Sequence, residues 1–304
     1  VATTPDGSVY VTGRAGGDLD GQVSAGFDDF FVTKFTSDGT KLWTRLVGTA
    51  DDDTPEDIAV DAEGNAYITG YTASSMPGQS SQGDYDAVLV KYAPDGSRQW
   101  VRQWGSSATD LATGVTTDAT GNVYVAGETY GTMPSQTLLG NSDAFFTKFT
   151  STGEISMTRQ WGSSDYDGGV HIACDIMGNI YISGSSYGDI DGEINSGGND
   201  ILLSKYDSPG TRLWSRLSGN GNWLEGERVS ISATGTIYVS GGVNGDLDGV
   251  PAFGDWDIFV LAYDAAGTKL ETTIKGTADT EYSNGATLTP SGGLIVAGST
   301  NGDM

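Results

Sequence analysis

A seven-residue phrase occurs six times in this 304-residue chain, and its copies are evenly spaced. It has the pattern Gly-x-x-Tyr-(Val/Ile)-x-Gly, and the tyrosine is replaced only in the last copy, by Ile295. Consecutive copies are 57 residues apart, with no insertion or deletion between them. Because self-similarity at a fixed period marks a repeat architecture, the fold must be built from one small unit copied and stacked. The copies are GSVYVTG (7–13), GNAYITG (64–70), GNVYVAG (121–127), GNIYISG (178–184), GTIYVSG (235–241) and GGLIVAG (292–298).

A representative unit, residues 58–114, contains four segments rich in β-branched and aromatic residues. Glycines at 64 and 96 lie in two short connections, where a tight turn between strands favours a residue that adopts positive φ without steric cost. No stretch has a sustained 3.6-residue period, so no helix is required. The predicted strands are 58–61, 66–71, 86–92 and 98–104.

Four antiparallel strands per unit are typical of a β-propeller blade. A sheet that is apolar on both faces cannot bury both faces alone, and stacking blades about an axis gives each face a neighbour. A linear β-solenoid is the alternative, although solenoid coils are usually much shorter than this repeat. We therefore predict an all-β chain forming a single β-propeller domain (1–304), as an excerpt of a longer polypeptide. Its repeats would be 1–57, 58–114, 115–171, 172–228 and 229–285, with a partial sixth at 286–304.

Three phrases, DAFFTKF, LWTRLVG and GNVYVAG, resemble the bacterial SBBP repeat, which is named for a seven-bladed β-propeller. The resemblance extends over essentially the whole chain. It implies a bacterial extracellular or envelope-associated propeller, often part of a very large protein, with no common set of catalytic residues. Since the sixth copy begins cleanly at Ala286, we expect a closed ring of six or seven blades.

The net charge of −25 excludes two classes of partner. Nucleic acids need Lys and Arg to neutralise their phosphates, and anionic membrane surfaces attract basic segments. Cys174 is the only cysteine, so no intrachain disulfide or thiol-based zinc site is expected. Together with the resemblance, this favours a secreted or cell-surface protein that does not insert into a membrane and that is joined to other domains of a larger parent.

The acidic residues gather in the longer loops. In residues 1–57, nine of the eleven Asp and Glu lie in or beside the two long loops, which leave the same end of an antiparallel sheet. The motif Asp-x-Asp-Gly begins the first of these loops in three repeats, and further Asp or Asn residues follow about ten positions later. Alternating carboxylates followed by glycine suit a hard, oxygen-seeking cation. We predict calcium, with ligands Asp18, Asp20, Asp28, Asp189, Asp191, Asn199, Asp246, Asp248 and Asp255.

An alternative for the same motif is an Asx-turn that satisfies local backbone groups, because the complete calcium-loop pattern with its bidentate Glu is absent. Two repeats replace the motif with SSMPG (74–78) and GTMPS (131–135), and could not bind calcium in this way. A further set of acids recurs at the start of the third strand in every repeat, which predicts a structural hydrogen bond. These acids are Asp29, Asp86, Asp143, Asp200 and Asp257.

Basic and aromatic residues also recur at fixed positions. Lysines on the third strand and arginines on the fourth are predicted to pair with cross-strand carboxylates. Tryptophans 43, 100 and 214 share one position in the fourth strand and are predicted to pack between repeats. Trp223 and Trp256 lie in the acidic loops and are candidates for ligand contact. The basic residues are Lys34, Lys91, Lys148, Lys205, Arg45, Arg102, Arg159 and Arg216.

No catalytic residue is predicted. His171 is the only histidine, and it is three positions from Cys174 on one predicted strand, so the two side chains point to opposite faces. We expect a non-enzymatic structural or adhesive module whose acidic loop side binds calcium and a protein or polysaccharide partner. The alternatives are a carbohydrate-active hydrolase or lyase that uses loop carboxylates, and an inert spacer.

Overall fold

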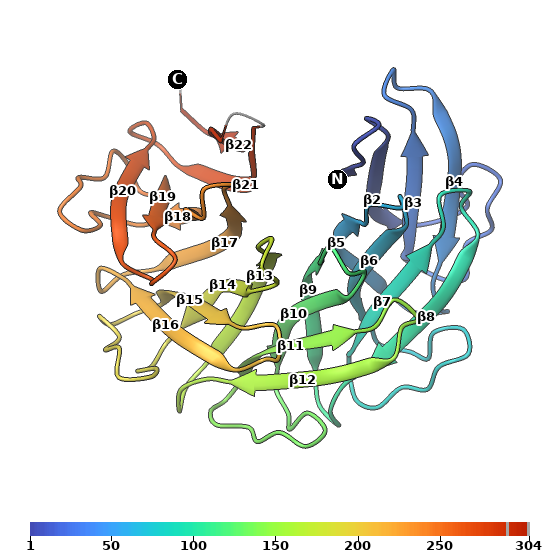
Figure 1. Ribbon diagram of the computed structural model, residues 1–304, viewed down its shortest axis with the longest axis horizontal. Helices are drawn as coiled ribbons and strands as arrows, with labels where there is room; N and C mark the ends of the chain where they lie inside the picture. The colour runs from blue at the N-terminus through green and yellow to red at the C-terminus, as the bar shows by residue number, and fades with distance from the viewer. Residues whose placement is uncertain (290–291, 303–304) are drawn as a thin grey trace. The chain divides into compact units, whose positions relative to one another are not determined.

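All regular secondary structure in the described part of the chain is β-strand. The computed structural model describes residues 1–289 and 292–302, which contain twenty-two strands and no helix (Figure 1). Consequently, none of these residues belongs to a helix that could cross a membrane. The end of the predicted partial repeat, at 303–304, lies outside the described residues. The prediction of an all-β fold is confirmed.

Each repeat forms a four-stranded antiparallel meander in which neighbours in sequence are neighbours in the sheet. The chain divides into two compact units, and the first comprises residues 1–138 and 145–160. It contains the first three sheets, except for a few residues of β11 and β12 that belong to the second unit. Its strands are β1 (Ala2–Thr3), β2 (Val9–Ala15), β3 (Asp29–Phe35), β4 (Lys41–Val47), β5 (Asp53–Val60), β6 (Ala66–Thr72), β7 (Asp86–Tyr92), β8 (Arg98–Trp104), β9 (Asp110–Thr117), β10 (Val123–Thr129), β11 (Asp143–Phe149) and β12 (Ile155–Trp161).

The second unit comprises residues 139–144 and the chain from Trp161 onward. It contains two four-stranded sheets and a pair of strands. Its strands are β13 (Asp167–Cys174), β14 (Ile180–Ser186), β15 (Asp200–Tyr206), β16 (Arg212–Ser218), β17 (Leu224–Ile231), β18 (Ile237–Val243), β19 (Asp257–Tyr263), β20 (Lys269–Lys275), β21 (Glu281–Leu288) and β22 (Leu294–Thr300).

The strands agree with the predicted positions except at the start of each sheet. Strands β6, β7 and β8 match the predicted segments to within one residue. The predicted first strand at 58–61 is wrong at its beginning, because β5 starts at Asp53. A β-bulge between Pro55 and Asp57 shifts the register, so that the alternation of apolar and polar residues is interrupted. The residues before the bulge are mostly polar, which made them look like loop.

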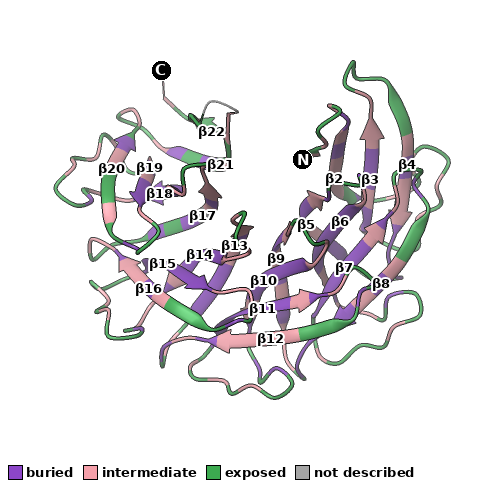
Figure 2. Cartoon of the chain, viewed as in Figure 1, coloured by how far each residue is buried: buried purple, intermediate pink, exposed green. Residues whose placement is uncertain are grey.

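Successive sheets pack face to face through equivalent residues. In the first unit, Tyr10 and Phe30 of the first sheet form a buried cluster with Ile68 and Val88 of the second sheet. The second and third sheets repeat this packing with the residues 57 positions later. In the second unit, the sheets of β13–β16 and β17–β20 repeat it again. Figure 2 shows buried residues along the inner strands, and exposed residues in the long loops and on the outer strands such as β8 and β16.

The outermost strands β4, β8 and β16 are each fastened to a turn of the next repeat. Arg102 on β8 donates from Nε to the carbonyl of Gly153 at 2.7 Å and from Nη2 to that of Thr152 at 3.1 Å. Its guanidinium lies 5.3 Å from the ring of Trp100. Because these carbonyls belong to a tight turn, the sheet ladder does not use them, and the arginine satisfies them. The same Nε-to-carbonyl bond joins Arg45 to Gly96 and Arg216 to Gly267.

Carboxylate partners, which were predicted for the recurring lysines and arginines, occur at Arg102 and at Arg216, which donates to Glu193 at 3.4 Å, but the shorter hydrogen bonds of these arginines go to turn carbonyls. Lys91 donates to the carbonyl of Ser151 at 3.2 Å, and its ammonium group lies 5.1 Å from the ring of Tyr67. Carboxylates are secondary partners where they occur, as for Glu154, whose oxygen is 3.6 Å from Arg102. The predicted packing of the tryptophans is confirmed, since Trp43 packs in the cluster between the first two sheets and donates to the carbonyl of Pro94 at 3.1 Å.

We expect Arg102→Ala to lower the free energy of unfolding by about 1–3 kcal/mol, because it removes charge-assisted hydrogen bonds and leaves two turn carbonyls without their donor. Chemical denaturation would measure the change. Arg98→Ala is the matched control, since Arg98 is exposed at the start of the same strand, and it should change stability by no more than about 0.5 kcal/mol. Equal effects of the two substitutions would contradict the proposed fastening.

Candidate functional site

The Asp-x-Asp-Gly motif forms a small hairpin at the start of a long loop. Leu19 and Gln22 exchange both backbone hydrogen bonds, at 3.1 and 2.9 Å. Between them, Asp20 and Gly21 have φ values of 52° and 76°. Positive φ at both central residues defines a type I′ turn, for which Asp-Gly is a preferred sequence. The same reciprocal hydrogen bonds and positive φ values recur at Asp191–Gly192 and Asp248–Gly249.

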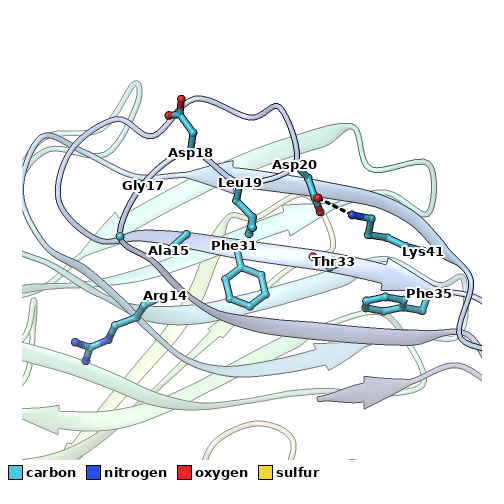
Figure 3. A pocket seen from close by; sticks show the side chains of 11 residues that line it. Arg14, Ala15, Gly17, Asp18, Leu19, Asp20, Phe31, Thr33, Phe35 and Lys41 are labelled. Atoms are coloured by element: carbon cyan, nitrogen blue, oxygen red, sulfur yellow. Dashed lines mark hydrogen bonds and ion pairs between the residues drawn. The ribbon is translucent and has the colours of Figure 1, made fainter.

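The two carboxylates of the motif have separate structural partners. Asp18 accepts a hydrogen bond from the backbone N–H of Ser24 at 2.9 Å, which closes the loop. Asp20 accepts from Lys41 Nζ and from Thr44 Oγ1, each at 2.5 Å, and so fastens the loop to β4 (Figure 3). The hydrogen bond from Lys41 lowers the pKa of Asp20. The other two copies repeat this arrangement. In one, Asp189 accepts from the backbone N–H of Asn195, and Asp191 accepts from Arg212 and Ser215. In the other, Asp246 accepts from the backbone N–H of Ala252, and Asp248 accepts from Lys269 and Thr272.

The remaining predicted calcium ligands also lie apart from one another. Asp28 is 4.0 Å from Arg14, Asn199 donates to the carbonyl of Leu224 at 2.8 Å, and Asp255 is exposed. Within residues 1–289 and 292–302, no group of three or more His, Cys, Asp or Glu side chains is arranged to hold a metal ion. The calcium site remains a prediction, and the hydrogen bonds give these acids a role in holding the loop.

The repeats without the motif anchor their loops in another way. Met76 of SSMPG occupies the position of Leu19 and is buried. Its backbone N–H donates to Gln103 Oε1 on β8 at 2.8 Å. Met133 of GTMPS makes the equivalent bond to Gln160 at 2.9 Å. Both loop types thus insert one apolar side chain and bind the fourth strand, which favours a structural purpose for the motif.

We expect Asp248→Asn to lower the melting temperature equally in calcium and in chelator, because an amide cannot pair with the ammonium group of Lys269. Differential scanning fluorimetry would measure this. The exposed Asp84, which is not among the predicted calcium ligands, provides the control Asp84→Asn, which should melt like the parent chain. A melting temperature that rises with calcium in the parent and is insensitive to calcium in Asp248→Asn would instead support the calcium site.

The recurring acids at the start of the third strand are confirmed as structural hydrogen-bond acceptors. Each is buried and accepts from the backbone N–H four residues earlier. Asp29, for example, accepts from Ala25 at 2.7 Å. The other donors are Gln82 for Asp86, Leu139 for Asp143, Ser196 for Asp200 and Phe253 for Asp257.

A second set of buried acids was missed by sequence reasoning. Asp110 is 0% exposed at the start of β9, and it faces Asp86 across Gly105. A β-carbon on Gly105 would lie 2.4 Å from Asp110 Oδ2 and 3.0 Å from Asp86 Oδ1, so the two carboxyl groups are neighbours and only glycine fits between them. Burial, assisted by the charge of Asp86, raises the pKa of Asp110. The signal was the recurrence of Gly-(Ser/Thr)-x-x-x-(Asp/Glu) at 48–53, 105–110, 162–167 and 276–281.

Trp223, a predicted ligand contact, is 56% exposed and belongs to a row of aromatic side chains. Its ring centre is 5.8 Å from that of Tyr187, at an interplanar angle of 82°. The ring of Tyr187 is in turn 6.2 Å from that of Tyr166, which is 47% exposed. These three residues, here called the aromatic row, come from the loops before β13, after β14 and before β17.

Trp256, the other predicted ligand contact, lies outside the aromatic row. It is only half-buried, and its ring lies close to Gly242 on β18, where a β-carbon would be 3.1 Å from it. The segment before Trp223 is rich in amides and glycine. Asn220 donates to the carbonyls of Asn244 and Asp246 at 2.9 and 2.8 Å, which fixes the loop that presents Trp223.

A cavity of about 850 Å³ lies below the first Asp-x-Asp-Gly loop, with Phe31, Thr33 and Phe35 in its lining (Figure 3). Val88 and Phe145 occupy the position of Phe31 in the second and third repeats. Both are 0% exposed and pack against the preceding sheet. The side chains that line this cavity are therefore equivalent to those that pack between sheets in other repeats, and the cavity does not have the character of a ligand pocket.

His171 has a structural contact. Its Nδ1 atom accepts from the backbone N–H of Val229 at 3.4 Å, which joins β13 to β17. In the first unit, Asp57 makes the equivalent bond to the N–H of Val115 at 3.0 Å. The bulged residue of one inner strand thus binds the next inner strand.

Two stretches, residues 42–75 and 99–132, match the SBBP beta-propeller repeat. The chain therefore contains SBBP β-propeller repeats in these two stretches, and its repeated four-stranded antiparallel sheets have the form of propeller blades. This confirms the resemblance seen in the sequence.

Longer proteins are similar to this chain. The regulatory protein FlaEY of Caulobacter vibrioides is 23% identical over 268 residues, which cover 81% of this chain and 27% of FlaEY. The uncharacterized WD repeat-containing protein L264 of Acanthamoeba polyphaga mimivirus is 30% identical over 153 residues, or 44% of this chain and 11% of L264. The chain thus spans less than a third of the length of these relatives.

Among solved structures, a protein of unknown function from Bacteroides caccae has a TM-score of 0.45 and 9% identity, covering 84% of this chain and 80% of the other. The Synechocystis apocarotenoid oxygenase has a TM-score of 0.43 and 12% identity, covering 88% of this chain and 62% of the oxygenase.

Proposed function

We propose that the chain is a non-enzymatic binding module that attaches to a neutral polysaccharide outside the cell. The observation that supports this best is the aromatic row, in which three side chains from separate loops contact one another while two remain about half exposed. An aromatic ring presents a large, rigid apolar face with little conformational entropy to lose on binding. The C–H faces of sugar rings are a suitable partner for such surfaces.

The charge around the aromatic row favours a neutral ligand over an anionic one. The net charge of the chain is −25, so a polyanion would be repelled. The segment leading to Trp223, Ser-Gly-Asn-Gly-Asn-Trp, contains no ionisable group. Asn222 is exposed next to Trp223 in the sequence, and its amide nitrogen donates to the carbonyl of Asn244 at 3.3 Å. Amide groups both donate and accept hydrogen bonds, as recognition of sugar hydroxyls requires.

A binding role also agrees with the other features of the chain. The carboxyl groups that the fold does bring together, such as Asp86 and Asp110, are 0% exposed and so are out of reach of a substrate. Neither of the curated relatives is named as an enzyme: one is called a regulatory protein and the other a WD repeat-containing protein. An adhesive role at a bacterial surface, with calcium at the acidic loops, remains part of the proposal.

Trp223→Ala should weaken binding to a neutral polysaccharide by about threefold to tenfold, because one aromatic contact is lost. A glycan array followed by affinity electrophoresis would identify the polysaccharide and measure the change. Tyr85→Ala is the matched control, since Tyr85 is an exposed tyrosine in an edge-to-face pair with Tyr71, outside the aromatic row. Its binding should equal that of the parent chain.

Two results would contradict the proposal. Retention by a polysaccharide that survives Trp223→Ala unchanged would exclude the aromatic row as the binding surface. Absence of binding to every neutral glycan, combined with a protein partner whose affinity depends on Trp223, would replace the polysaccharide with a protein ligand.

A further inference from the structure

We propose that three buried aspartate pairs are proton-binding sites, each holding one proton shared between its two carboxyl groups. The pairs are Asp29 with Asp53, Asp86 with Asp110, and Asp143 with Asp167. All six side chains are at most 1% exposed. Each pair joins the start of a third strand to the start of the next sheet, so the proton would link folding to pH.

In the first two pairs, the third-strand aspartate has one oxygen without a donor in the described structure, and that oxygen faces the partner. Asp86 Oδ2 accepts from Gln82 N and from Gln103 Nε2, both at 2.8 Å, whereas Oδ1 has no partner and faces Asp110 Oδ2 across Gly105. Asp29 Oδ1 is likewise without a partner and faces Asp53 Oδ2 across Gly48. In the third pair, Asp143 Oδ1 accepts from Gly140 N at 3.3 Å and faces Asp167 Oδ2 across Gly162. A buried oxygen that lacks a hydrogen bond is costly, and a proton placed between the two carboxyl groups removes this cost.

The groups that surround the pairs favour a proton over a metal ion. Asp110 accepts from Ser106 N at 2.6 Å, from Ser106 Oγ at 3.0 Å and from Thr129 Oγ1. These neighbours donate hydrogen bonds, which suits one carboxylate anion, while a cation would need further oxygen acceptors. The neighbours that face Asp53 are Thr49, Thr72 and Asp29, and those that face Asp167 are Ser163, Ser186 and Asp143. Apart from the partner aspartate, these neighbours are neutral.

Like charges in one buried site cannot both ionise freely, which is why such pairs retain a proton. Burial, followed by the charge of the partner, raises the pKa of Asp53, Asp110 and Asp167, although hydrogen bonds from Ser and Thr oppose the rise. Because the two members of a pair interact, the proton belongs to the pair and is not assigned to one residue.

The fourth repeat supplies a natural comparison. Leu224 occupies the position of Asp110, so Asp200 has no second carboxyl group. Asp200 Oδ1, the oxygen that has no partner in Asp29 and Asp86, here accepts a hydrogen bond from Ser196 Oγ at 2.6 Å. The positions equivalent to Ser196 in the three paired repeats are Ala25, Gln82 and Leu139, none of which has a hydroxyl group. The chain therefore provides a hydroxyl donor for this oxygen where the second acid is missing.

The pair of the fifth repeat differs and is outside the proposal. Glu281 takes the place of Asp110, and hydrogen bonds from Thr300 and Thr277 lower its pKa. Asp257 Oδ1 nevertheless lacks a donor, as Asp29 Oδ1 and Asp86 Oδ1 do.

The consequence for stability has a definite sign. Aspartates of the unfolded chain lose their protons near the ordinary pKa of 3.8, whereas a folded pair keeps one proton to higher pH. Folding therefore takes up protons above this pH, and the stabilisation is lost as the pH rises through the higher pKa of the folded pair.

Asp86→Asn tests the proposal, because its amide nitrogen can take the place of a protonated Oδ1 and donate to Asp110 Oδ2, while its amide oxygen accepts from Gln82 and Gln103 as Oδ2 does. At pH 8 we expect the variant to melt about 2–4 °C above the parent chain, and this difference should be smaller at pH 5, where the parent pair holds more of its proton. Urea titrations across this range should show that the variant releases one proton fewer on unfolding. Asp29→Asn should behave in the same way.

Asp200→Asn is the control, since it makes the same chemical change where no pair exists, and its effect should not depend on pH. The proposal is overturned if Asp86→Asn is destabilised by the same amount at pH 5 and pH 8. It is also overturned if calcium raises the melting temperature of the parent at pH 8 more than sodium of equal ionic strength does, and Asp86→Asn abolishes that rise. The second result would assign a cation to the pair.

Discussion

A four-stranded sheet with apolar side chains on both faces is stable only where another sheet covers each face, and this constraint accounts for the fixed repeat length. Tyr10 and Phe30 meet Ile68 and Val88 only because both sheets present the same register. An insertion of one residue in a strand would turn every following side chain to the opposite face. The turns are equally constrained, since Arg102 reaches the carbonyl of a residue 51 positions later in the chain. Strand lengths and turn lengths therefore cannot vary independently.

The long loops are free of this packing requirement, and there the repeats differ most. Each loop has to insert one apolar residue and hold the fourth strand, and Leu19 with Asp20 achieves this as well as Met76 with Gln103 does. The rest of the loop sequence is then available for other purposes. The aromatic row has arisen in the repeats where Tyr166 and Trp223 occupy equivalent positions of adjacent loops. Function in such a protein is thus expected to depend on a few repeats and not on the repeated pattern.

The fold could be predicted from the sequence because its determinants are local or periodic. Strand alternation, turn glycines and the 57-residue interval are visible without coordinates, and they located β6, β7 and β8 to within one residue. Contacts made through backbone atoms leave no such signal. The partner of Lys91 is the carbonyl of Ser151, and any residue there would supply one. The bulge before Asp57 was likewise hidden, because a bulge breaks the alternation by which strands are recognised.

The site was harder to predict, since the meaning of an acidic residue depends on its surroundings. Asp6 and Asp110 are chemically identical, but a hydroxyl donor from Thr4 lowers the pKa of the exposed Asp6 to about 2, whereas burial raises that of Asp110. The first kind of acid contributes stability that is lost as the pH falls below 3.8. The second kind contributes stability that is lost as the pH rises. A chain with 40 acidic residues therefore combines opposing dependences of stability on pH.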